Sequence, residues 1–223
     1  MKNLAILVPS RERPSNIAEL IKSLDETETE SDLIVILDDD EPCFEQYIEL
    51  GATMITIEKE GRGMAKPLNF AANLFKDDYR HFAFLGDDNR PRTKNWDVHF
   101  INALDELETG IVYGNDLFQG EALPTAAALT GNIVKALGGM VPQGMIHLYL
   151  DNFWLRLGQD LGAIRYLPEI VIEHLHPYAG KSSWDQVYRD VNSPEMYSAD
   201  KQALEDYLNS SAYIELLNGL KQA

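Results

Sequence analysis

Short apolar runs alternate with amphipathic segments along the first half of the chain. The apolar runs predict buried strands in NLAILVP (3–9), DLIVILDDD (32–40), TMITI (53–57), HFAFLGDDN (81–89) and GIVYG (110–114). Between the first two runs, apolar side chains recur at the i, i+3, i+4, i+7 spacing of a helix. Further helices are expected over residues 44–50, 65–75 and 97–108. This alternation predicts an α/β fold with a mostly parallel central sheet flanked by helices.

The second half of the chain has a less regular pattern. Residues 120–145 are rich in glycine, alanine and small polar residues without a clear period, which predicts a mobile segment. A helix is expected over residues 145–162, and the glycine at position 162 marks its end. Two short strands separated by Pro168 are expected within residues 163–177.

Chain length and composition favour one compact domain. A second full domain would be cramped in 223 residues, so we expect one domain over residues 1–180. A polar C-terminal helical appendage, residues 181–223, is expected to pack on the same domain, with its helix over 199–219. No apolar run approaches the ~18 residues that cross a bilayer. The single cysteine, Cys43, excludes an internal disulfide and predicts a reducing compartment, the cytoplasm.

The charge of the chain is strongly negative, with 19 basic and 36 acidic residues and a net charge of −17. Such a surface repels nucleic acid, whose binding depends on basic side chains that neutralise phosphates, so a nucleic-acid partner is not expected. Three short stretches nevertheless gather positive charge. They contain Arg11 and Arg13, Arg62 and Lys66, and Arg90, Arg92 and Lys94. An acidic protein with its positive charge in a few loops is expected to bind a small polyanion.

Polar side chains gather where the predicted strands end. Ligands of open α/β sheets bind just beyond the carboxyl ends of the strands. Aspartate oxygens and an imidazole suit Mn²⁺ or Mg²⁺, and substrate phosphates complete the coordination shell. An isolated pair of aspartates would be weak evidence, because acidic turns are usually only solvated. The residues at the strand ends are Ser10 and Arg11, Asp38, Asp39 and Asp40, Asp87 and Asp88, and His174 and His176.

Such a site fits a reaction in which a nucleoside diphosphate departs. This group leaves only when its developing negative charge is compensated, which a divalent cation and fixed basic groups achieve in a site shielded from water. On this interpretation Asp87 and Asp88 supply the cation. Arg62, Lys66 or Arg11 would supply the remaining positive charge.

Five segments follow one another along residues 4–180 in a recognisable order. They are AILVPSRERPSNIAELIKSL, VILDDD, GRGMAKPLNFAAN, FAFLGDDNRPRTKNW and YLDNFWLRLGQDLGAIRYLPEIVIEHLHP. Together they resemble glycosyltransferases with the GT-A fold, particularly the large family 2 group. The first resembles the opening strand and helix, the second the strand that meets the nucleoside, and the third the loop that meets the diphosphate. The fourth is similar to the Asp-X-Asp metal segment. The fifth is similar to the acceptor-side carboxylate and a late metal-binding histidine.

The resemblance implies a metal-dependent glycosyltransferase that moves a sugar from a nucleotide-sugar, with UDP-sugars favoured, to a hydroxyl acceptor. The acceptor would be a glycan, a lipid-linked sugar, a protein or a small molecule, with residues 120–145 on its side of the site. The implied donor contacts are Pro9, Ser10, Arg11, Asp39 with Asp38 as the next choice, Arg62, Lys66, Asn69 and Asp87. The implied ligands of Mn²⁺ or Mg²⁺ are Asp88 and either His174 or His176, and Asp151 is the candidate general base.

Two departures from the family pattern bear on these roles. Gly86 stands where the first aspartate of Asp-X-Asp is expected, which leaves Asp88 as the matching ligand. The usual Glu-Asp acceptor motif is Leu150-Asp151 here. If Asp151 is the base, the reaction inverts the anomeric carbon. Retaining enzymes of this fold need no such base, and the sequence does not decide between the two outcomes. As an alternative, Asp151 is the N-cap of its helix.

Other functional classes remain as alternatives. A sugar-1-phosphate nucleotidyltransferase would use a similar sheet and metal, but the segment after the first strand, PSRERP, has no glycine. A metal-dependent phosphohydrolase of nucleotide-sugars and a non-catalytic nucleotide- or carbohydrate-binding module also fit the strand-end residues. A dinucleotide-dependent dehydrogenase is disfavoured because no G-x-G-x-x-G follows a strand. No G-x-S-x-G supports a serine hydrolase.

Overall fold

The computed structural model describes residues 1–61, 63–177, 180–181 and 186–222. In this part of the chain eight strands form one sheet in the order β3-β2-β1-β4-β7-β6-β8-β5. β7 and β5 run antiparallel to their neighbours, and the other strands share one direction. The strands are β1 (Lys2–Pro9), β2 (Asp32–Asp38), β3 (Thr53–Ile57), β4 (Tyr79–Phe84), β5 (Asn89–Pro91), β6 (Ile111–Asn115), β7 (Ala127–Thr130) and β8 (Ile164–His174).

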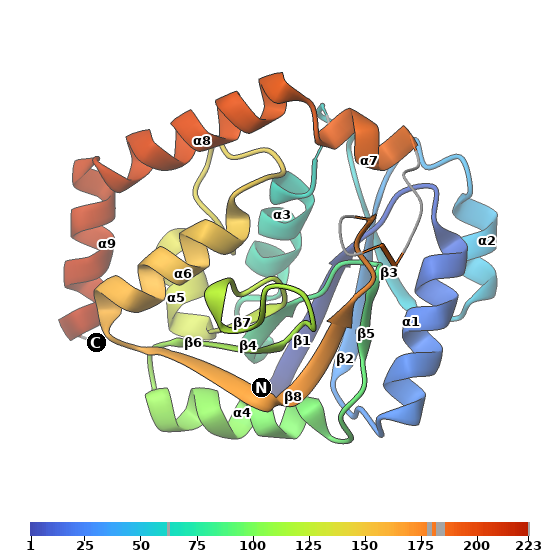
Figure 1. Cartoon of the computed structure of the whole chain (residues 1–223), viewed down its shortest axis with the longest axis horizontal. Helices are drawn as coiled ribbons and strands as arrows, with labels where there is room; N and C mark the ends of the chain where they lie inside the picture. Colours follow the sequence, from blue (N-terminus) through green and yellow to red (C-terminus); the bar gives the residue numbers. More distant parts are fainter. Residues whose placement is uncertain (62, 178–179, 182–185, 223) are drawn as a thin grey trace.

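Helices cover both faces of the sheet (Figure 1). On one face, a core is completed by α1 (Pro14–Glu26), α2 (Phe44–Glu49) and α4 (Trp96–Leu107). On the other face, a second core is completed by α3 (Ala65–Phe75), α5 (Gly131–Leu137), α6 (Leu150–Leu161), α8 (Pro194–Leu208) and α9 (Ser211–Gln222). A short 3-10 helix, η1 (Gly120–Ala122), precedes β7. The predicted α/β class, with a mostly parallel sheet flanked by helices, is confirmed.

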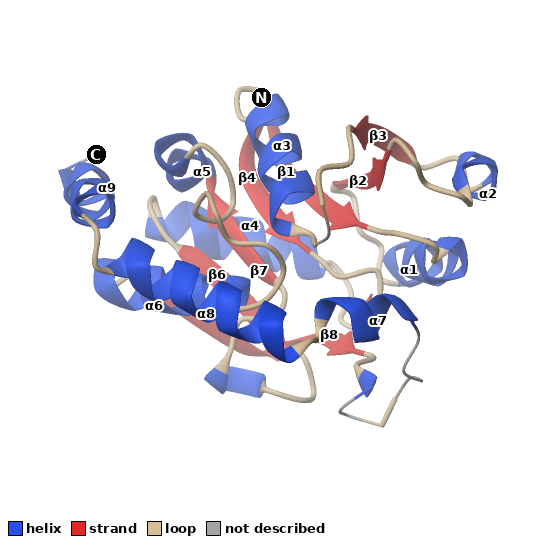
Figure 2. Ribbon diagram, turned by 90° about the horizontal axis from the view of Figure 1, so that it is seen from above, coloured by secondary structure: helices blue, strands red, loops and turns tan. Residues whose placement is uncertain are grey.

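The C-terminal helices contribute to the core of the domain. Leu204 of α8 and Tyr213, Leu216 and Leu220 of α9 are buried in the same cluster as α5 and α6. A short helix, α7 (Gln186–Val191), precedes them. Figures 1 and 2 show α7 and α8 on the side of the molecule toward which β1 and β8 point. The boundary at residue 180 stays a prediction. None of the helices in the described part of the chain has the length and apolarity needed to cross a membrane.

Three expectations for the second half of the chain are wrong. The single helix expected over residues 199–219 is divided between two helices, α8 and α9. Residues 120–145 are not irregular throughout, because β7 lies fully buried between β4 and β6 and is followed by α5. Residues 163–177 contain one strand rather than two. The pairing of β8 with β6 shifts from Gly114–Leu167 to Asn115–Val171, so Pro168 lies in an irregularity of the ladder. Proline has no backbone N–H group to donate, and it is tolerated at such an irregularity.

Candidate active site

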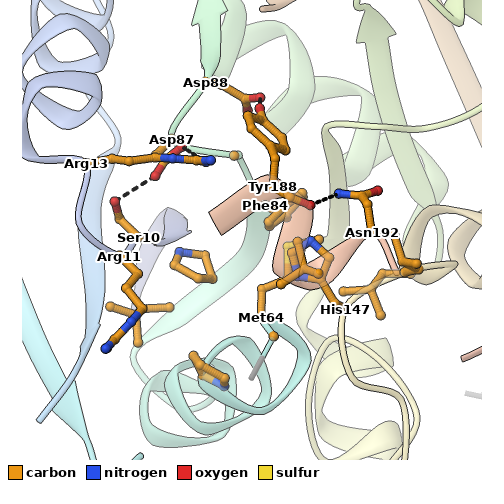
Figure 3. A pocket seen from close by; sticks show the side chains of 18 of the residues that line it. Ser10, Arg11, Arg13, Met64, Phe84, Asp87, Asp88, His147, Tyr188 and Asn192 are labelled. Carbon is orange, nitrogen blue, oxygen red and sulfur yellow. Dashed lines mark hydrogen bonds and ion pairs between the residues drawn. The ribbon is translucent and has the colours of Figure 1, made fainter. Parts of the chain in front are cut away.

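A cavity of about 480 Å³ lies at the carboxyl ends of the strands. Its wall is formed by residues at the carboxyl ends of β1, β2, β4 and β8 and just beyond β1, β4 and β8. The loop between β3 and α3, the start of α6 and α7 complete it (Figure 3). This is the place where open α/β sheets bind ligands, and the volume lies in the range that accommodates a small molecule. Segments more than a hundred residues apart therefore share one site.

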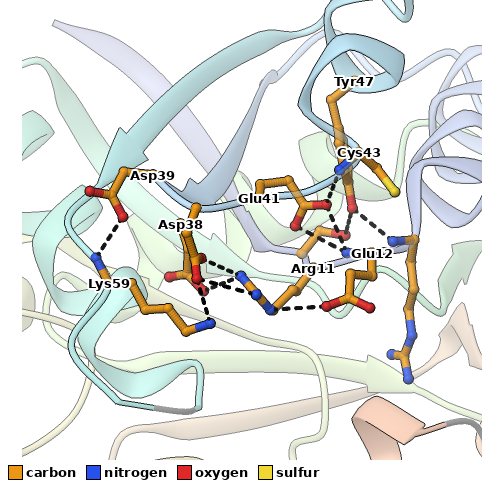
Figure 4. A network of polar contacts seen from close by, with 11 residues as sticks. Arg11, Glu12, Asp38, Asp39, Glu41, Cys43, Tyr47 and Lys59 are labelled. Carbon is orange, nitrogen blue, oxygen red and sulfur yellow. Dashed lines mark hydrogen bonds and ion pairs between the residues drawn. The ribbon is translucent and has the colours of Figure 1, made fainter.

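Charged side chains form the end of the cavity next to β2 (Figure 4). The guanidinium of Arg11 lies 3.2 Å from the Oδ2 atom of Asp38 and 2.6 Å from the Oδ1 atom of Asp40. The Lys59 ammonium is 2.9 Å from Asp40. Burial raises the pKa of Asp38, and the charge of Arg11 opposes this effect. This end of the cavity thus offers the Asp38 carboxylate beside two cations, Arg11 and Lys59, and Glu12 also lines it, 3.4 Å from Arg11.

Asp39 points away from Arg11 (Figure 4) and is not among the residues of the cavity wall. Its Oδ1 atom accepts a hydrogen bond from the backbone N–H of Lys59 at 3.0 Å. Ile36 and Asp38 share one face of β2, and both line the cavity. Alternation along the strand therefore places Asp38, rather than Asp39, where a ligand can reach it.

A buried hydrogen-bond chain joins β1 to the turn after β4. The Ser10 hydroxyl donates to the Oδ2 atom of Asp87 at 2.8 Å and lies 2.9 Å from the Tyr47 hydroxyl. Since the Ser10 proton goes to Asp87, the Tyr47 hydroxyl is the donor to Ser10. Arg13 reaches the Oδ1 atom of Asp87 at 3.4 Å. Burial and the neighbouring charge of Asp88 raise the pKa of Asp87. Asp87 thus links the two strand ends.

Asp88 meets the end of β8 and helix α7. Its Oδ2 atom lies 3.3 Å from the Nε2 atom of His174 and accepts a hydrogen bond from the Tyr188 hydroxyl. Burial alone would raise the pKa of Asp88, but the contacts with His174 and Tyr188 lower it below its usual value. Burial alone would lower the pKa of His174, but the Asp88 carboxylate outweighs it and the pKa is raised. His176 packs edge-on against His174, with ring centroids 5.0 Å apart.

Asp88 and His174 have the donor atoms and the spacing of two ligands of one cation. Neighbouring ligands at right angles lie about 3 Å apart when each is about 2.1 Å from the ion. The 3.3 Å between the Asp88 and His174 atoms is close to this separation. No group of three His, Cys, Asp or Glu side chains within the described residues is arranged to hold a metal ion. Water and substrate phosphates would therefore complete the shell of a bound Mn²⁺ or Mg²⁺.

The glycine at position 86 leaves room for the Asp88 carboxylate. A Cβ atom on Gly86 would lie 2.6 Å from the Oδ1 atom of Asp88. A side chain at this position would therefore force the Asp88 carboxylate to rotate or shift. The departure from the Asp-X-Asp pattern thus has a steric reason in this chain.

The start of α6 forms another part of the cavity wall. Asp151 lies in the first turn of this helix and lines the cavity. The N-cap is Tyr149, with φ 62°, so the alternative in which Asp151 is the N-cap is wrong. Burial raises the pKa of Asp151. A carboxylate with a raised pKa is the better acceptor for the proton of a hydroxyl group.

A buried carboxylate from the C-terminal part holds the loop before α6. Asp200 of α8 accepts hydrogen bonds from the backbone N–H groups of Ile146 at 2.6 Å, His147 at 2.9 Å and Leu148 at 2.7 Å. From the other side, a Cβ atom on Gly63 would lie only 2.3 Å from the Ile146 carbonyl oxygen. The loop before α6 is therefore packed between α8 and the glycine-containing loop. This packing also explains why the helix predicted from residue 145 begins only at residue 150.

Two of the predicted donor-site residues lie outside the wall of the main cavity, and a third lies outside the described residues. Lys66 is exposed and pairs with Glu60, outside the wall of the main cavity. Asn69 is buried, and its Oδ1 atom accepts from the backbone N–H groups of Met140 and Val141. Its contacts therefore order the chain after α5 rather than face a ligand. Arg62 lies outside the described residues.

Three residues in the cavity wall were not assigned a role from the sequence. Arg13 has its guanidinium 4.2 Å from the ring centroid of Tyr188 and lies within the cavity (Figure 3). His147 is held neutral, because burial lowers its pKa to about 4. The stretch of positive charge after β1 includes Arg13, which was a usable signal. Neither His147 nor Tyr188 belongs to a motif, so only the structure identifies them.

Solved structures from three sources resemble the chain over most of its length. TarS from S. aureus matches 98% of the chain with a TM-score of 0.61 and 16% identity. The mannosyltransferase PcManGT from Pyrobaculum calidifontis, in complex with GDP-Man and Mn²⁺, matches 98% with a TM-score of 0.59 and 14% identity. Glucosyl-3-phosphoglycerate synthase from Mycobacterium tuberculosis, in complex with Mn²⁺, UDP and glucosyl-3-phosphoglycerate, matches 93% with a TM-score of 0.60 and 14% identity.

The chain spans 43%, 73% and 79% of the lengths of these three proteins. Neither protein-family models nor curated proteins match the chain in sequence. The likeness is therefore one of structure, and it extends over nearly every strand and helix described above. On this evidence the chain has the GT-A fold of glycosyltransferases.

Proposed function

We propose that this chain is a metal-dependent glycosyltransferase that moves a sugar from a nucleotide-sugar donor to a hydroxyl acceptor. The observation that carries the proposal is the convergence of carboxylates and an imidazole from four separate segments on one cavity. These residues are Asp38, Asp88, Asp151 and His174. The GT-A fold gives independent support, because its solved relatives include one complex with GDP-Man and one with UDP, both with Mn²⁺.

The nucleoside is proposed to bind at the end of the cavity next to β2. There Asp38 offers a carboxylate to the hydroxyl or amide groups of a nucleoside, and Arg11 lies beside it. Pro9 and Ser10 line the same region. UDP is our first choice of nucleotide because of the family 2 resemblance of the sequence.

The diphosphate is proposed to lie between Asp88 and Arg13. A divalent cation held by Asp88 and His174 would compensate the charge of the departing diphosphate. Arg13 is largely buried and carries a fixed positive charge beside the same carboxylates, which supports a role in binding the phosphates. Tyr188 donates a hydrogen bond to Asp88 in the structure, so its hydroxyl would have to share or yield that carboxylate.

Asp151 is proposed as the general base. Its carboxylate would take the proton of the acceptor hydroxyl while that oxygen bonds to the anomeric carbon and the bond from this carbon to the diphosphate breaks. One displacement of this kind inverts the configuration of the sugar. The raised pKa of Asp151 supports the assignment, because proton transfer to it is then more favourable.

A thermal-shift panel of nucleoside diphosphates, with Mn²⁺ or with EDTA, tests the donor half of the proposal. A ligand present at about 100 times its Kd adds about 2.7 kcal/mol of stability, which raises the Tm of a protein of this size by roughly 5–10 °C. We expect one diphosphate to give such a shift only with metal. Asp88→Asn should abolish the shift. Asp38→Asn should weaken it, and Asp39→Asn, one residue away and outside the cavity, is the matched control.

Transfer assays test the catalytic half. Asp151→Asn should retain the metal-dependent thermal shift and lose sugar transfer. If no diphosphate stabilises the protein with or without metal, the proposal is wrong. Cleavage of the nucleotide-sugar without acceptor, at a rate that equals transfer, would instead identify a phosphohydrolase.

A further inference from the structure

The loop after β6 presents two apolar side chains to solvent beside the cavity. Leu117 and Phe118 are exposed over 50% and 42% of their surfaces. Leu117 has a φ of 58°, a left-handed conformation that costs energy for a leucine. Burial of apolar surface does not explain this arrangement, because both side chains remain in contact with water. Strain of this kind is found most often at sites that bind ligands.

A buried carboxylate makes this loop rigid. The Oδ1 atom of Asp116 accepts hydrogen bonds from the backbone N–H groups of Phe118 at 2.9 Å, Gln119 at 2.7 Å and Gly120 at 2.8 Å. Its Oδ2 atom accepts from the hydroxyl of Thr125, which lines the cavity, at 2.8 Å. The backbone at Phe118 is therefore tied to Asp116, and through Thr125 the loop is joined to the cavity wall.

The Phe118 ring continues the wall of the cavity outward. It is stacked on the His176 ring, with centroids 6.1 Å apart and an angle of 9° between the planes. His176 lines the cavity and packs against His174, whose Nε2 atom faces Asp88. The exposed Phe118 ring is thus connected to Asp88 through two stacked or packed rings, His176 and His174.

We propose that Phe118 is the platform of a second sugar subsite, which binds the ring next to the acceptor sugar in an oligosaccharide or glycan. One face of a pyranose ring carries C–H groups, and these pack on the electron-rich face of an aromatic ring. The hydroxyl groups at the edge of such a sugar stay accessible to the exposed side chains of Gln119 and Glu121 in the same loop. The proposal rests on the proposed glycosyltransferase function and narrows its acceptor to a carbohydrate of at least two units.

The test compares methyl glycosides of one, two and three sugar units as acceptors, with the donor that the thermal-shift panel identifies. Wild type should prefer the disaccharide to the monosaccharide. Phe118→Ala should lower kcat/KM about tenfold for the disaccharide, mainly through KM, and leave the monosaccharide and the donor KM unchanged. Phe118→Trp should retain the preference. Phe70→Ala is the matched control, because Phe70 of α3 is also 42% exposed and is not among the residues of the cavity wall.

The two proposals fail in different ways. If sugar transfer occurs and Phe118→Ala equals wild type with every acceptor length, the platform is refuted and the glycosyltransferase proposal stands. If no transfer occurs, titration of the same glycosides by calorimetry still decides. Disaccharide binding that is lost in Phe118→Ala would support the subsite, and equal or absent binding in the two proteins would overturn it.

Discussion

Replacing Asp200 with alanine removes the acceptor of three backbone N–H groups in the loop before α6. A buried N–H group that loses its partner costs about 1–3 kcal/mol. The Asp200 side chain is fully buried, but the three amides are only partly so, and water would replace some of the lost bonds. Taking the lower half of the range for each of the three amides gives a loss of about 3–6 kcal/mol. For a protein of this size that corresponds to a fall in Tm of roughly 10 °C.

Two further variants calibrate this number. Asp200→Asn keeps one oxygen that can accept but turns an NH₂ group toward the donors, so we expect roughly half of the loss. Asp206→Ala is the matched control. Asp206 is exposed on the same helix and, within the described residues, bonds only to the side chain of Gln202. The loss of unfolding free energy in Asp206→Ala should therefore stay within about 0.5 kcal/mol. Urea unfolding followed by circular dichroism gives all three free energies.

The same change should also affect the proposed reaction. The loop that Asp200 holds leads directly to His147 and Asp151, which line the cavity. At a temperature where Asp200→Asn is folded, we expect a higher acceptor KM and a lower kcat, with nucleotide binding close to wild type. If Asp200→Ala melts within 2 °C of Asp206→Ala, the three hydrogen bonds do not hold the loop as we infer from the structure.

Three other predictions concern the burial of His147 and the space around Gly63 and Gly86. Burial lowers the pKa of His147 to about 4 from 6.5, so stability that is present above pH 6.5 is lost as the pH falls toward 4. Between pH 7 and pH 5, wild type in EDTA should lose about 2 kcal/mol more unfolding free energy than His147→Gln, and equal losses would contradict this. Gly63→Ala should lower the unfolding free energy by at least about 2 kcal/mol more than Gly61→Ala. Both glycines have a positive φ, but only a Cβ atom at residue 63 would meet a backbone carbonyl group. Urea unfolding of the two variants tests this difference. Gly86→Ala should displace the Asp88 carboxylate and weaken metal-dependent nucleotide binding about tenfold, measured by calorimetry, and unchanged affinity would refute the steric argument.

The sequence by itself determined the α/β class and the edge of the sheet at which the site lies. Strands β1 and β2 contain continuous apolar runs bounded by polar residues, and this pattern depends only on neighbouring residues. Because parallel strands bring their carboxyl ends together, polar residues after each run were expected to meet. Along β8, Ile170 and Ile172 are buried and His174 lies at the edge of the sheet. This alternation could also be predicted from the sequence, because the side chains of a strand repeat every two residues.

The tertiary structure alone decided which of these residues face the ligand. β7 is only four residues long, and its AALT sequence has no period; its burial follows from pairing with β4 and β6. The choice of Asp38 over Asp39 depends on how β2 meets the cavity. Asp200 bonds a loop more than fifty residues away, and Tyr188 meets Asp88 across a hundred. Contacts between such distant segments leave no pattern in the neighbouring sequence, because they form only when the folded chain brings the segments together.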